Sequence, residues 1–403
     1  MKKKADEGLK YIQKLGIRAE RSYENVVNNL IKACGENEAK AYLDRIMDAQ
    51  KTVISDLYAG KNSDFEKCMI FTGGYDADVV RKTCNWIDAN KQYFGKNILE
   101  IGCDCGFVTC FVAMACPEAS IVAIDREPDG LKIADQLAKK LGITNIEFRH
   151  CDSEDMAEAA FDTVLSVRTI QENREDLPMK AVFQPLDVQM TKYYLDVLKG
   201  YAENVAHLTD EGGRIISIER CVMDPLYLAW LKDMKAAGCG MQADSFEVIK
   251  CEELGHPCQM QAITFVKGTD CEDDAIDALW HKDYRMEMPV PGNKPGDLIA
   301  YQGWEAEAVL NRYAGELVNG FYVTTGDGMV AAKYAIYRCK DNEDVIFSYS
   351  GTGTAISMAA MDKQFLEVNE TSLMGAGKDL RSKGFIIKHL VQMDGYEAAG
   401  ALL

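Results

Sequence analysis

The feature that most constrains the fold of this chain is an alternation between short β-branched runs and longer segments with helical spacing, from about residue 75 to residue 268. Strands and helices that alternate in this way are typical of a parallel sheet with helices on both faces, so the pattern predicts a doubly wound α/β sheet. The expected strands are Asn97–Ile101, Ser120–Asp125, Ile146–His150, Thr163–Val167 and Arg214–Glu219, with helices such as Gly130–Leu141 and Tyr193–His207 between them.

The last two strand-like segments break this alternation. Ser245–Cys251 and Met260–Lys267 are separated by a loop with Gly and Pro that is too short to hold a helix. Two strands joined by such a loop pair with each other antiparallel. We therefore expect a seven-stranded sheet that ends in an antiparallel hairpin.

The regions on either side of the sheet have different patterns. The chain has 403 residues, more than one hydrophobic core usually needs. Apolar residues at helical spacing, such as Leu9, Ile12 and Leu15, predict a helical N-terminal extension over residues 1–70. The sheet domain would span residues 71–268, and residues 269–403 would form a small α+β domain. Its expected parts are an antiparallel meander, whose aromatic residues should be mostly buried, and a helical tail near Ala376–Val391. The strands of the meander are expected at Phe321–Thr325, Val330–Tyr337 and Val345–Tyr349.

Charge and apolar runs limit the partners of the protein. A net charge of −18 repels the nucleic-acid backbone on average, so we expect no nucleic-acid partner. The charged start MKKKADEGLKYIQKL lacks the apolar run of a signal peptide, and no later segment is apolar enough to span a bilayer. We therefore expect a cytoplasmic protein with no membrane partner, whose fourteen cysteines are reduced.

A glycine corner follows the first expected strand, in the stretch NILEIGCDCGFVTCFVA from Asn97 to Ala113. Cys103 and Cys105 are one residue apart, which is not the CxxC spacing of structural zinc sites, so we expect no metal here. A dinucleotide site would have G-x-G-x-x-G, and only Gly102 and Gly106 are present. An NAD(P)-dependent oxidoreductase is therefore a weaker alternative.

The corner resembles the first motif of the class I S-adenosylmethionine-dependent methyltransferases, an acid and any residue followed by G-x-G-x-G. The motif runs from Glu100 through Gly102 and Cys103 to Gly106, with Asp104 in place of the middle glycine. The resemblance covers residues 70 to 268 and implies a Rossmann-like fold with S-adenosylmethionine as cofactor. Asp104 could tilt the methionine end of that cofactor or bind its ammonium group.

The second and third strands carry acids at the positions where this family binds adenosine. The resemblance implies that Asp125 binds both ribose hydroxyls and that Asp152, with Ser153 beside it, accepts the adenine amino group. Arg126 could pack on the adenine or be a solvated loop arginine. Asp152 and Ser153 could also serve as the N-cap of the following helix.

The fourth strand, FDTVLSVRTIQEN, matches the F-D-x-V pattern of the family, and the resemblance implies that Ser166 to Arg168 pass beneath the sulfonium. The loop after it would handle the methyl acceptor through Arg168, Glu172 and Asn173, or these residues could form surface ion pairs and helix caps. His150 could be a base, although a histidine inside a strand is more often packed. The stretch lacks the N-P-P-Y motif that marks methylation of amides and of the adenine amino group.

The resemblance implies an enzyme that transfers a methyl group to a small-molecule acceptor by in-line displacement. A second hypothesis is a non-catalytic relative that holds a partner. The aromatic residues of the C-terminal domain could cap the active site or form a homodimer contact. Pro257-Cys258-Gln259 spells the P-C-Q of cytosine-5 methyltransferases but lies in the terminal hairpin, so we assign Cys258 no role.

Overall fold

The protein divides into two compact units in its computed structural model. The first comprises residues 1–174, 198–222 and 230–276, and the second comprises residues 175–197, 223–229 and 277–403. Each unit is described separately below. The structure describes residues 6–50, 54–156, 161–170, 188–220, 225–272, 275–276, 291, 298–302, 306, 309–310, 313–324, 330–352, 355–393 and 396–402.

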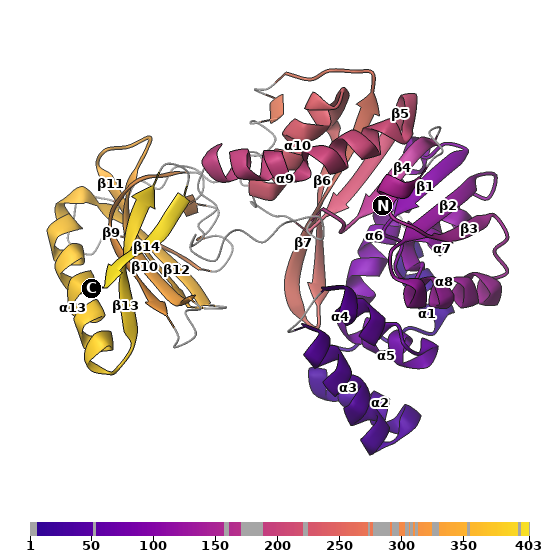
Figure 1. Ribbon diagram of the computed structural model, residues 1–403, viewed down its shortest axis with the longest axis horizontal. Helices are drawn as coiled ribbons and strands as arrows, with labels where there is room; N and C mark the ends of the chain where they lie inside the picture. Colours follow the sequence, from indigo (N-terminus) through magenta and orange to yellow (C-terminus); the bar gives the residue numbers. More distant parts are fainter. Residues whose placement is uncertain are drawn as a thin grey trace, which may run out of the picture. The chain divides into compact units, whose positions relative to one another are not determined.

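The first unit is built on a seven-stranded sheet with the strand order β3-β2-β1-β4-β5-β7-β6 (Figure 1). The first five strands are parallel and β7 runs antiparallel to both of its neighbours, which confirms the predicted doubly wound sheet with a terminal hairpin. The strands are β1 (Asn97–Ile101), β2 (Ser120–Asp125), β3 (Ile146–His150), β4 (Phe161–Val167), β5 (Thr209–Glu219), β6 (Cys239–Glu253) and β7 (His256–Lys267).

Helices follow the parallel strands as the sequence predicts. They are α7 (Phe107–Ala115), α8 (Pro128–Leu141), α9 (Val188–His207) and α10 (Pro225–Ala236), with the short 3-10 helix η2 (Ser153–Asp155) after β3. Gly142, with φ of 71° in the left-handed region, ends α8 where a side chain would strain the backbone. The parallel strands are apolar on both faces because helices cover both of them, and Ile98 and Leu99 of β1 are both fully buried.

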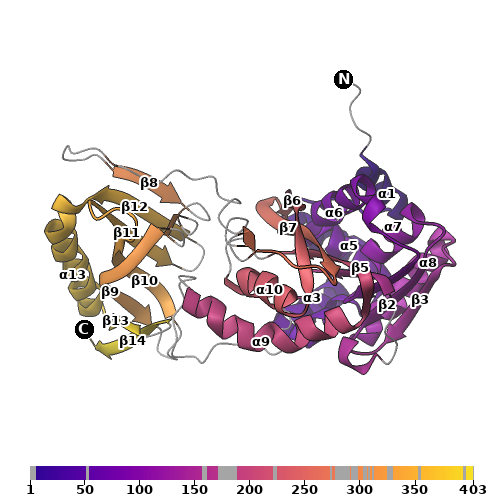
Figure 2. The ribbon, with the colours of Figure 1, turned by 90° about the horizontal axis from the view of Figure 1, so that it is seen from above.

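Six helices and a short 3-10 helix precede the sheet: α1 (Glu7–Leu15), α2 (Tyr23–Cys34), α3 (Glu36–Gln50), α4 (Ile54–Lys61), α5 (Phe65–Tyr75), α6 (Ala77–Ala89) and η1 (Lys91–Tyr93). The predicted spacing is confirmed in α1, where Ile12 and Leu15 are buried in the same core as the sheet. Figure 2 shows α1 beside α7, and the Tyr11 hydroxyl donates to the carbonyl of Phe107 at 2.7 Å. The N-terminal helices therefore belong to the first unit.

The second unit contains a second seven-stranded sheet, in the order β14-β13-β9-β10-β11-β12-β8, in which neighbouring strands are antiparallel. Its helix α13 (Leu366–Ser382) packs against β9, β10 and β13 (Figure 2). The strands are β8 (Leu298–Gln302), β9 (Ala314–Thr324), β10 (Val330–Cys339), β11 (Val345–Thr352), β12 (Ala355–Asp362), β13 (Ile386–Met393) and β14 (Tyr396–Leu402).

The meander β9-β10-β11 was predicted and is confirmed, and most of its aromatic residues are buried, among them Phe321, Tyr322, Tyr337 and Phe347. The predicted helical tail is wrong in its second half, because Ile386–Met393 is a strand that pairs with β9. Gly384 has φ of 90°, which a helix cannot accommodate. The helix therefore ends before it and the chain continues as β13.

Among the described residues, no helix is both long enough and apolar enough to cross a membrane.

Candidate functional site

At the glycine corner after β1, the backbone passes close to side chains from other segments of the chain. Gly102 has φ of 72°, and a Cβ added to it would lie 2.7 Å from Cγ2 of Thr169. Gly106 has φ of 70°, and its added Cβ would lie 2.7 Å from the Cβ of Ala134 in α8. Both positions therefore need glycine, for backbone conformation and for space.

Asp104, between these glycines, is a non-glycine residue in the left-handed region, with φ of 44°. One of its carboxylate oxygens lies 2.5 Å from Nζ of Lys61, and the other accepts from the Asn62 amide at 2.6 Å. Burial acts to raise the pKa of Asp104, but the Lys61 ammonium and the hydrogen bonds outweigh it, so the pKa lies below its usual value. The same carboxylate raises the pKa of Lys61 against the effect of burial. Both groups are charged at neutral pH.

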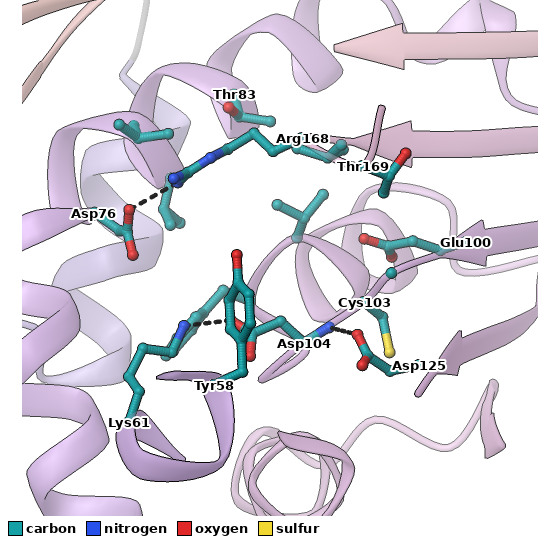
Figure 3. A pocket seen from close by; sticks show the side chains of 16 residues that line it. Tyr58, Lys61, Asp76, Thr83, Glu100, Cys103, Asp104, Asp125, Arg168 and Thr169 are labelled. Carbon is teal, nitrogen blue, oxygen red and sulfur yellow. Dashed lines mark hydrogen bonds and ion pairs between the residues drawn. The ribbon is translucent and has the colours of Figure 1, made fainter. Parts of the chain in front are cut away.

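Asp125, the last residue of β2, is held by the backbone. Its carboxylate accepts the N–H of Asp104 at 2.7 Å (Figure 3) and the N–H of Glu127 at 2.8 Å. Burial raises its pKa despite these bonds. Each carboxylate oxygen has a second lone pair, so the group can still accept hydrogen bonds from a ligand.

Two cavities meet at this corner. The larger, with a volume of about 130 Å³, is lined by ionisable side chains of Lys61, Asp76, Glu100, Asp104, Asp125 and Arg168, and by others that include Tyr58, Thr83 and Val108 (Figure 3). The smaller, of about 50 Å³, is lined by Arg126, Cys151, Asp152, Ser153 and Tyr201 among others. Gly102, Asp125 and Thr169 line both. Asp125 therefore lies at the junction of two spaces that a ligand with two ends could occupy together.

The smaller cavity brings together the residues that the sequence assigned to adenine. The Nε of Arg126 lies 3.7 Å from a carboxylate oxygen of Asp152. Asp152 is also the N-cap of η2, where it accepts the N–H of Glu154 at 3.2 Å. The cap that was the alternative role is thus present, and the side chain lines the cavity as well. His150 is exposed, and its Nε2 lies 3.0 Å from the carbonyl of Arg126.

Ser166 of β4 lies behind the cavity wall. It is fully buried and donates to the Glu219 carboxylate at 2.9 Å, while its oxygen lies 2.5 Å from that of Thr169. Thr169, which the sequence analysis did not select, faces both cavities and lies 2.8 Å from the Tyr201 hydroxyl. The assignment of Ser166 to the cofactor stays a prediction. In this structure the Ser166 hydroxyl contacts the hydroxyl of Thr169, which lines both cavities.

Arg168 lies at the far side of the larger cavity, with φ of 62°. Its guanidinium donates to Asp76 at 2.8 Å and lies 3.7 Å from Glu253. The Asp76 carboxylate raises the pKa of Arg168 further. The predicted acceptor residues Glu172 and Asn173 lie outside the described residues.

Glu100 of β1 is a buried carboxyl group in the wall of the larger cavity, with 2% of its surface exposed. Burial raises its pKa to about 8. Its Oε2 has no hydrogen-bond partner among the described residues. A mostly protonated acid is therefore present there at neutral pH.

The two cysteines of the corner have different neighbours. Cys103 packs with Ala123 and Leu131, whereas the Sγ of Cys105 lies 3.3 Å from the Sγ of Cys68 in α5. Both thiols of that pair face Oδ1 of Asn62, at 2.9 Å for Cys105 and 3.4 Å for Cys68. Within the described part of the chain, no group of three or more His, Cys, Asp or Glu residues is placed to hold a metal ion.

Sequence reasoning missed the side chains that reach the site from the N-terminal helices. Tyr58 and Lys61 come from α4, and Asp76 precedes α6. The sequence contains one indirect indication of them, namely Asp104 in the glycine loop. A buried acid needs a cation or a hydrogen-bond donor nearby. Nothing in the spacing showed that the cation would be Lys61.

Comparisons with known proteins match part of the chain to one family. A family model described as a methyltransferase domain matches residues 94–247. Residues 94–247 are a methyltransferase domain. The doubly wound sheet agrees with the Rossmann-like fold that the resemblance to class I S-adenosylmethionine-dependent methyltransferases implies.

Two curated relatives match part of this chain. The ubiquinone biosynthesis O-methyltransferase of Paracidovorax citrulli is 33% identical over 89 residues, which cover 21% of this chain and 37% of the relative. The enzyme of the same name from Pseudomonas syringae pv. tomato is 31% identical over 97 residues, which cover 23% and 40%. The chain thus spans less than half the length of each.

Solved structures resemble the chain at lower identity. A TehB-like SAM-dependent methyltransferase from Corynebacterium glutamicum is 14% identical, with 46% of this chain and 87% of that one covered, at a TM-score of 0.33. Magnesium protoporphyrin IX methyltransferase from Synechocystis PCC 6803 is 16% identical, with 47% and 82% covered, at a TM-score of 0.32. At these scores neither likeness supports an inference about the site.

Proposed function

We propose that this protein is an S-adenosylmethionine-dependent methyltransferase that transfers a methyl group to a small-molecule acceptor. The observation that carries the proposal is the position of Asp125. Its carboxylate is fixed by two backbone N–H groups at the junction of the two cavities, beside Gly102. A fixed carboxylate with free lone pairs is suited to a vicinal diol, and the cavities on either side leave room for the base and the amino-acid end of an adenosyl ligand.

The roles of the residues follow from their places in the cleft. Asp125 would bind the ribose, and Asp152 and Arg126 would hold the adenine in the smaller cavity. When bound, the cofactor supplies an activated methyl group. The chain's part is then to position the acceptor and exclude water, and the apolar side chains of Val79, Val80 and Val108 in the larger cavity are placed to do the latter.

Glu100 would support the charge of the ligand. A carboxyl group with a pKa of about 8 carries a partial negative charge at neutral pH, and a nearby cation increases that charge. It lies in the wall of the larger cavity. Binding of a positively charged ligand in that cavity would therefore favour the ionised form of Glu100.

Calorimetric titration tests the proposal on the purified full-length protein in the presence of a reductant. S-adenosylmethionine and S-adenosylhomocysteine should bind with micromolar affinity, whereas NADH should give no heat. Binding of NADH alone would favour an oxidoreductase and overturn the proposal.

Turnover separates an enzyme from a non-catalytic relative that only binds the cofactor. A radiolabelled methyl group should move from S-adenosylmethionine to a member of a metabolite panel, with S-adenosylhomocysteine as the second product. The names of the two curated relatives make hydroxyl-bearing small molecules the first acceptors to screen. Ligand binding without transfer to any acceptor class would support the non-catalytic hypothesis.

A further inference from the structure

The ion pair between Lys61 and Asp104 is a charged feature that the glycine corner does not need for its own fold. The class I motif has a glycine at the position of Asp104, and Lys61 belongs to α4, outside the matched residues 94–247. A buried ion pair is weak support for stability, since the cost of desolvating both charges offsets much of their attraction. A role toward a ligand explains the pair better.

We infer that Lys61 and Asp104 together bind the amino-acid end of the cofactor, with Lys61 on the carboxylate and Asp104 on the ammonium group. The chain would therefore select adenosyl ligands that keep both groups. This inference rests on the proposed function, and it adds the residues and the ligand chemistry that the larger cavity recognises.

The unused hydrogen-bonding capacity of the pair supports this assignment. Lys61 has three N–H donors and gives one to Oδ2 of Asp104 at 2.5 Å. Oδ1 of Asp104 accepts from Asn62 at 2.6 Å and from the Cys105 thiol at 3.3 Å. Lone pairs remain on Oδ2, and both side chains line the larger cavity, with 8% of the Lys61 side chain and 29% of the Asp104 side chain exposed.

The charges of the pair match those of an α-amino acid. An α-amino acid carries its ammonium and carboxylate on one carbon, so it presents two opposite charges side by side. Lys61 and Asp104 present the complementary pair at hydrogen-bond distance, and such a zwitterion would lie against them with each charge opposite its counter-charge. The Lys61 ammonium is already largely desolvated, with 8% of its side chain exposed, so little further cost falls on it when the ligand binds.

A second ion pair, Arg168 with Asp76, faces the same cavity and is the competing candidate. Arg168 also lies 3.7 Å from Glu253, which pairs with Arg220 at 2.8 Å, so its charge belongs to a longer network. Asp104, in contrast, is joined to the ribose site directly, because its own N–H donates to Asp125 at 2.7 Å. The charged end of the ligand is a short chain away from the ribose, which favours Lys61 and Asp104.

The test uses three ligands that differ in their amino-acid end. S-adenosylhomocysteine keeps both charged groups, decarboxylated S-adenosylmethionine keeps only the ammonium, and 5′-methylthioadenosine has neither. Lys61→Met should weaken S-adenosylhomocysteine by about 10- to 100-fold and leave the other two within about threefold. Asp104→Asn should weaken both ligands that carry the ammonium and spare 5′-methylthioadenosine.

Lys67→Met is the matched control, because Lys67 lies on α5, pairs with Glu38 and is absent from the cavity wall. It should bind all three ligands as the wild type does. Lys61→Arg keeps the cation and should retain affinity for S-adenosylhomocysteine within about fivefold. If Lys61→Met does not fold, the inference can still be tested with Lys61→Arg and the wild type. The wild type should bind S-adenosylhomocysteine about tenfold or more tightly than 5′-methylthioadenosine.

Two results would overturn the inference. If Lys61→Met weakens all three ligands equally, or the wild type binds 5′-methylthioadenosine as tightly as S-adenosylhomocysteine, the pair does not read the amino-acid end, and the proposed function still stands. If the wild type binds none of the three, the proposed function itself fails.

Discussion

The two cavities of the first unit share a junction but draw their walls from different parts of the chain. The smaller is lined by the ends of the parallel strands, the loops that follow them and one residue of α9, all after residue 100. The wall of the larger cavity also includes six residues between positions 58 and 83. They lie on α4, on α6 or directly before α6. The strand ends are common to any doubly wound sheet, whereas these helices lie outside the residues 94–247 that match the methyltransferase family. The difference teaches that one end of the cleft comes with the fold of the sheet and the other with the helices that precede it.

The largest expected effect comes from the junction, which serves both cavities. Asp125→Ala should reduce affinity for S-adenosylhomocysteine and 5′-methylthioadenosine alike, by about 100-fold or more, because both contain the ribose. It should also lower the free energy of unfolding by about 1–3 kcal/mol, since the N–H groups of Asp104 and Glu127 lose their acceptor. Calorimetry and thermal melts measure the two effects.

Asp129→Ala is a suitable control for that experiment. Asp129 also lies near the start of α8, but it pairs with Lys132 on the surface and lines neither cavity. Its affinity for both ligands should be that of the wild type. Wild-type affinity in Asp125→Ala would contradict the assignment of the junction.

Gly102→Ala tests the same junction through its backbone. The new methyl group would lie 2.7 Å from Cγ2 of Thr169, on a residue with φ of 72°. Thr169 is held by Ser166 and Tyr201, so it cannot turn away easily. We expect the variant to lose about 2–4 kcal/mol of stability and most of its ligand affinity.

A second substitution separates the steric part of that loss from the backbone part. Thr169→Ser removes Cγ2 and keeps the hydroxyl, so the double variant should recover the steric share, about 1–3 kcal/mol, in a denaturant titration. The backbone share should remain. No recovery in the double variant would show that the contact with Thr169 is not the cause.

These residues show why the sequence predicted one end of the cleft better than the other. Asp125, Arg126, Asp152 and Ser153 directly follow or end strands, and the carboxyl ends of parallel strands meet at one edge of the sheet. Their approach to one another therefore follows from strand prediction alone. Lys61 is 43 residues before its partner Asp104, and no periodic pattern links the two.

The same distinction explains the other differences from expectation. Ser166 and Thr169 are three residues apart, and the chain turns at Arg168, with φ of 62°, so that the later residue faces the cavity. The strand period does not extend through such a turn. In the second unit, the turn at Gly384 was likewise not recognised, and β13 was assigned to a helix.

A pH-dependent effect on stability is expected from the larger cavity. Glu100 lines the larger cavity and has a pKa raised to about 8 by burial, against 4.5 for an ordinary glutamate. The folded protein therefore holds a proton that the unfolded chain releases, so stability should fall as pH rises from about 4.5 to 8 and level off above it. The total loss is at most about 5 kcal/mol.

Glu100→Gln should remove that dependence, since an amide is neutral at every pH in this range. The difference in melting temperature between wild type and variant should grow in favour of the variant by several degrees between pH 5 and 8.5, on the order of 2–4 °C per kcal/mol. If the melting temperatures of the wild type and the variant instead change equally with pH over this range, Glu100 is charged in the folded protein at neutral pH.

The smallest effect is expected at the outer wall of the smaller cavity. Arg126→Ala removes a guanidinium whose side chain is 58% exposed and whose ion pair with Asp152, at 3.7 Å, is solvated. Stacking of such a group on an adenine contributes about 0.5–1 kcal/mol, so affinity should fall only about two- to fivefold. Because the adenine is common to S-adenosylhomocysteine and 5′-methylthioadenosine, both should weaken equally, in contrast to the Lys61 variants. Unequal loss would mean that Arg126 reaches the amino-acid end and that the cavities are not separate in function, whereas no loss would leave Arg126 as a solvated loop arginine.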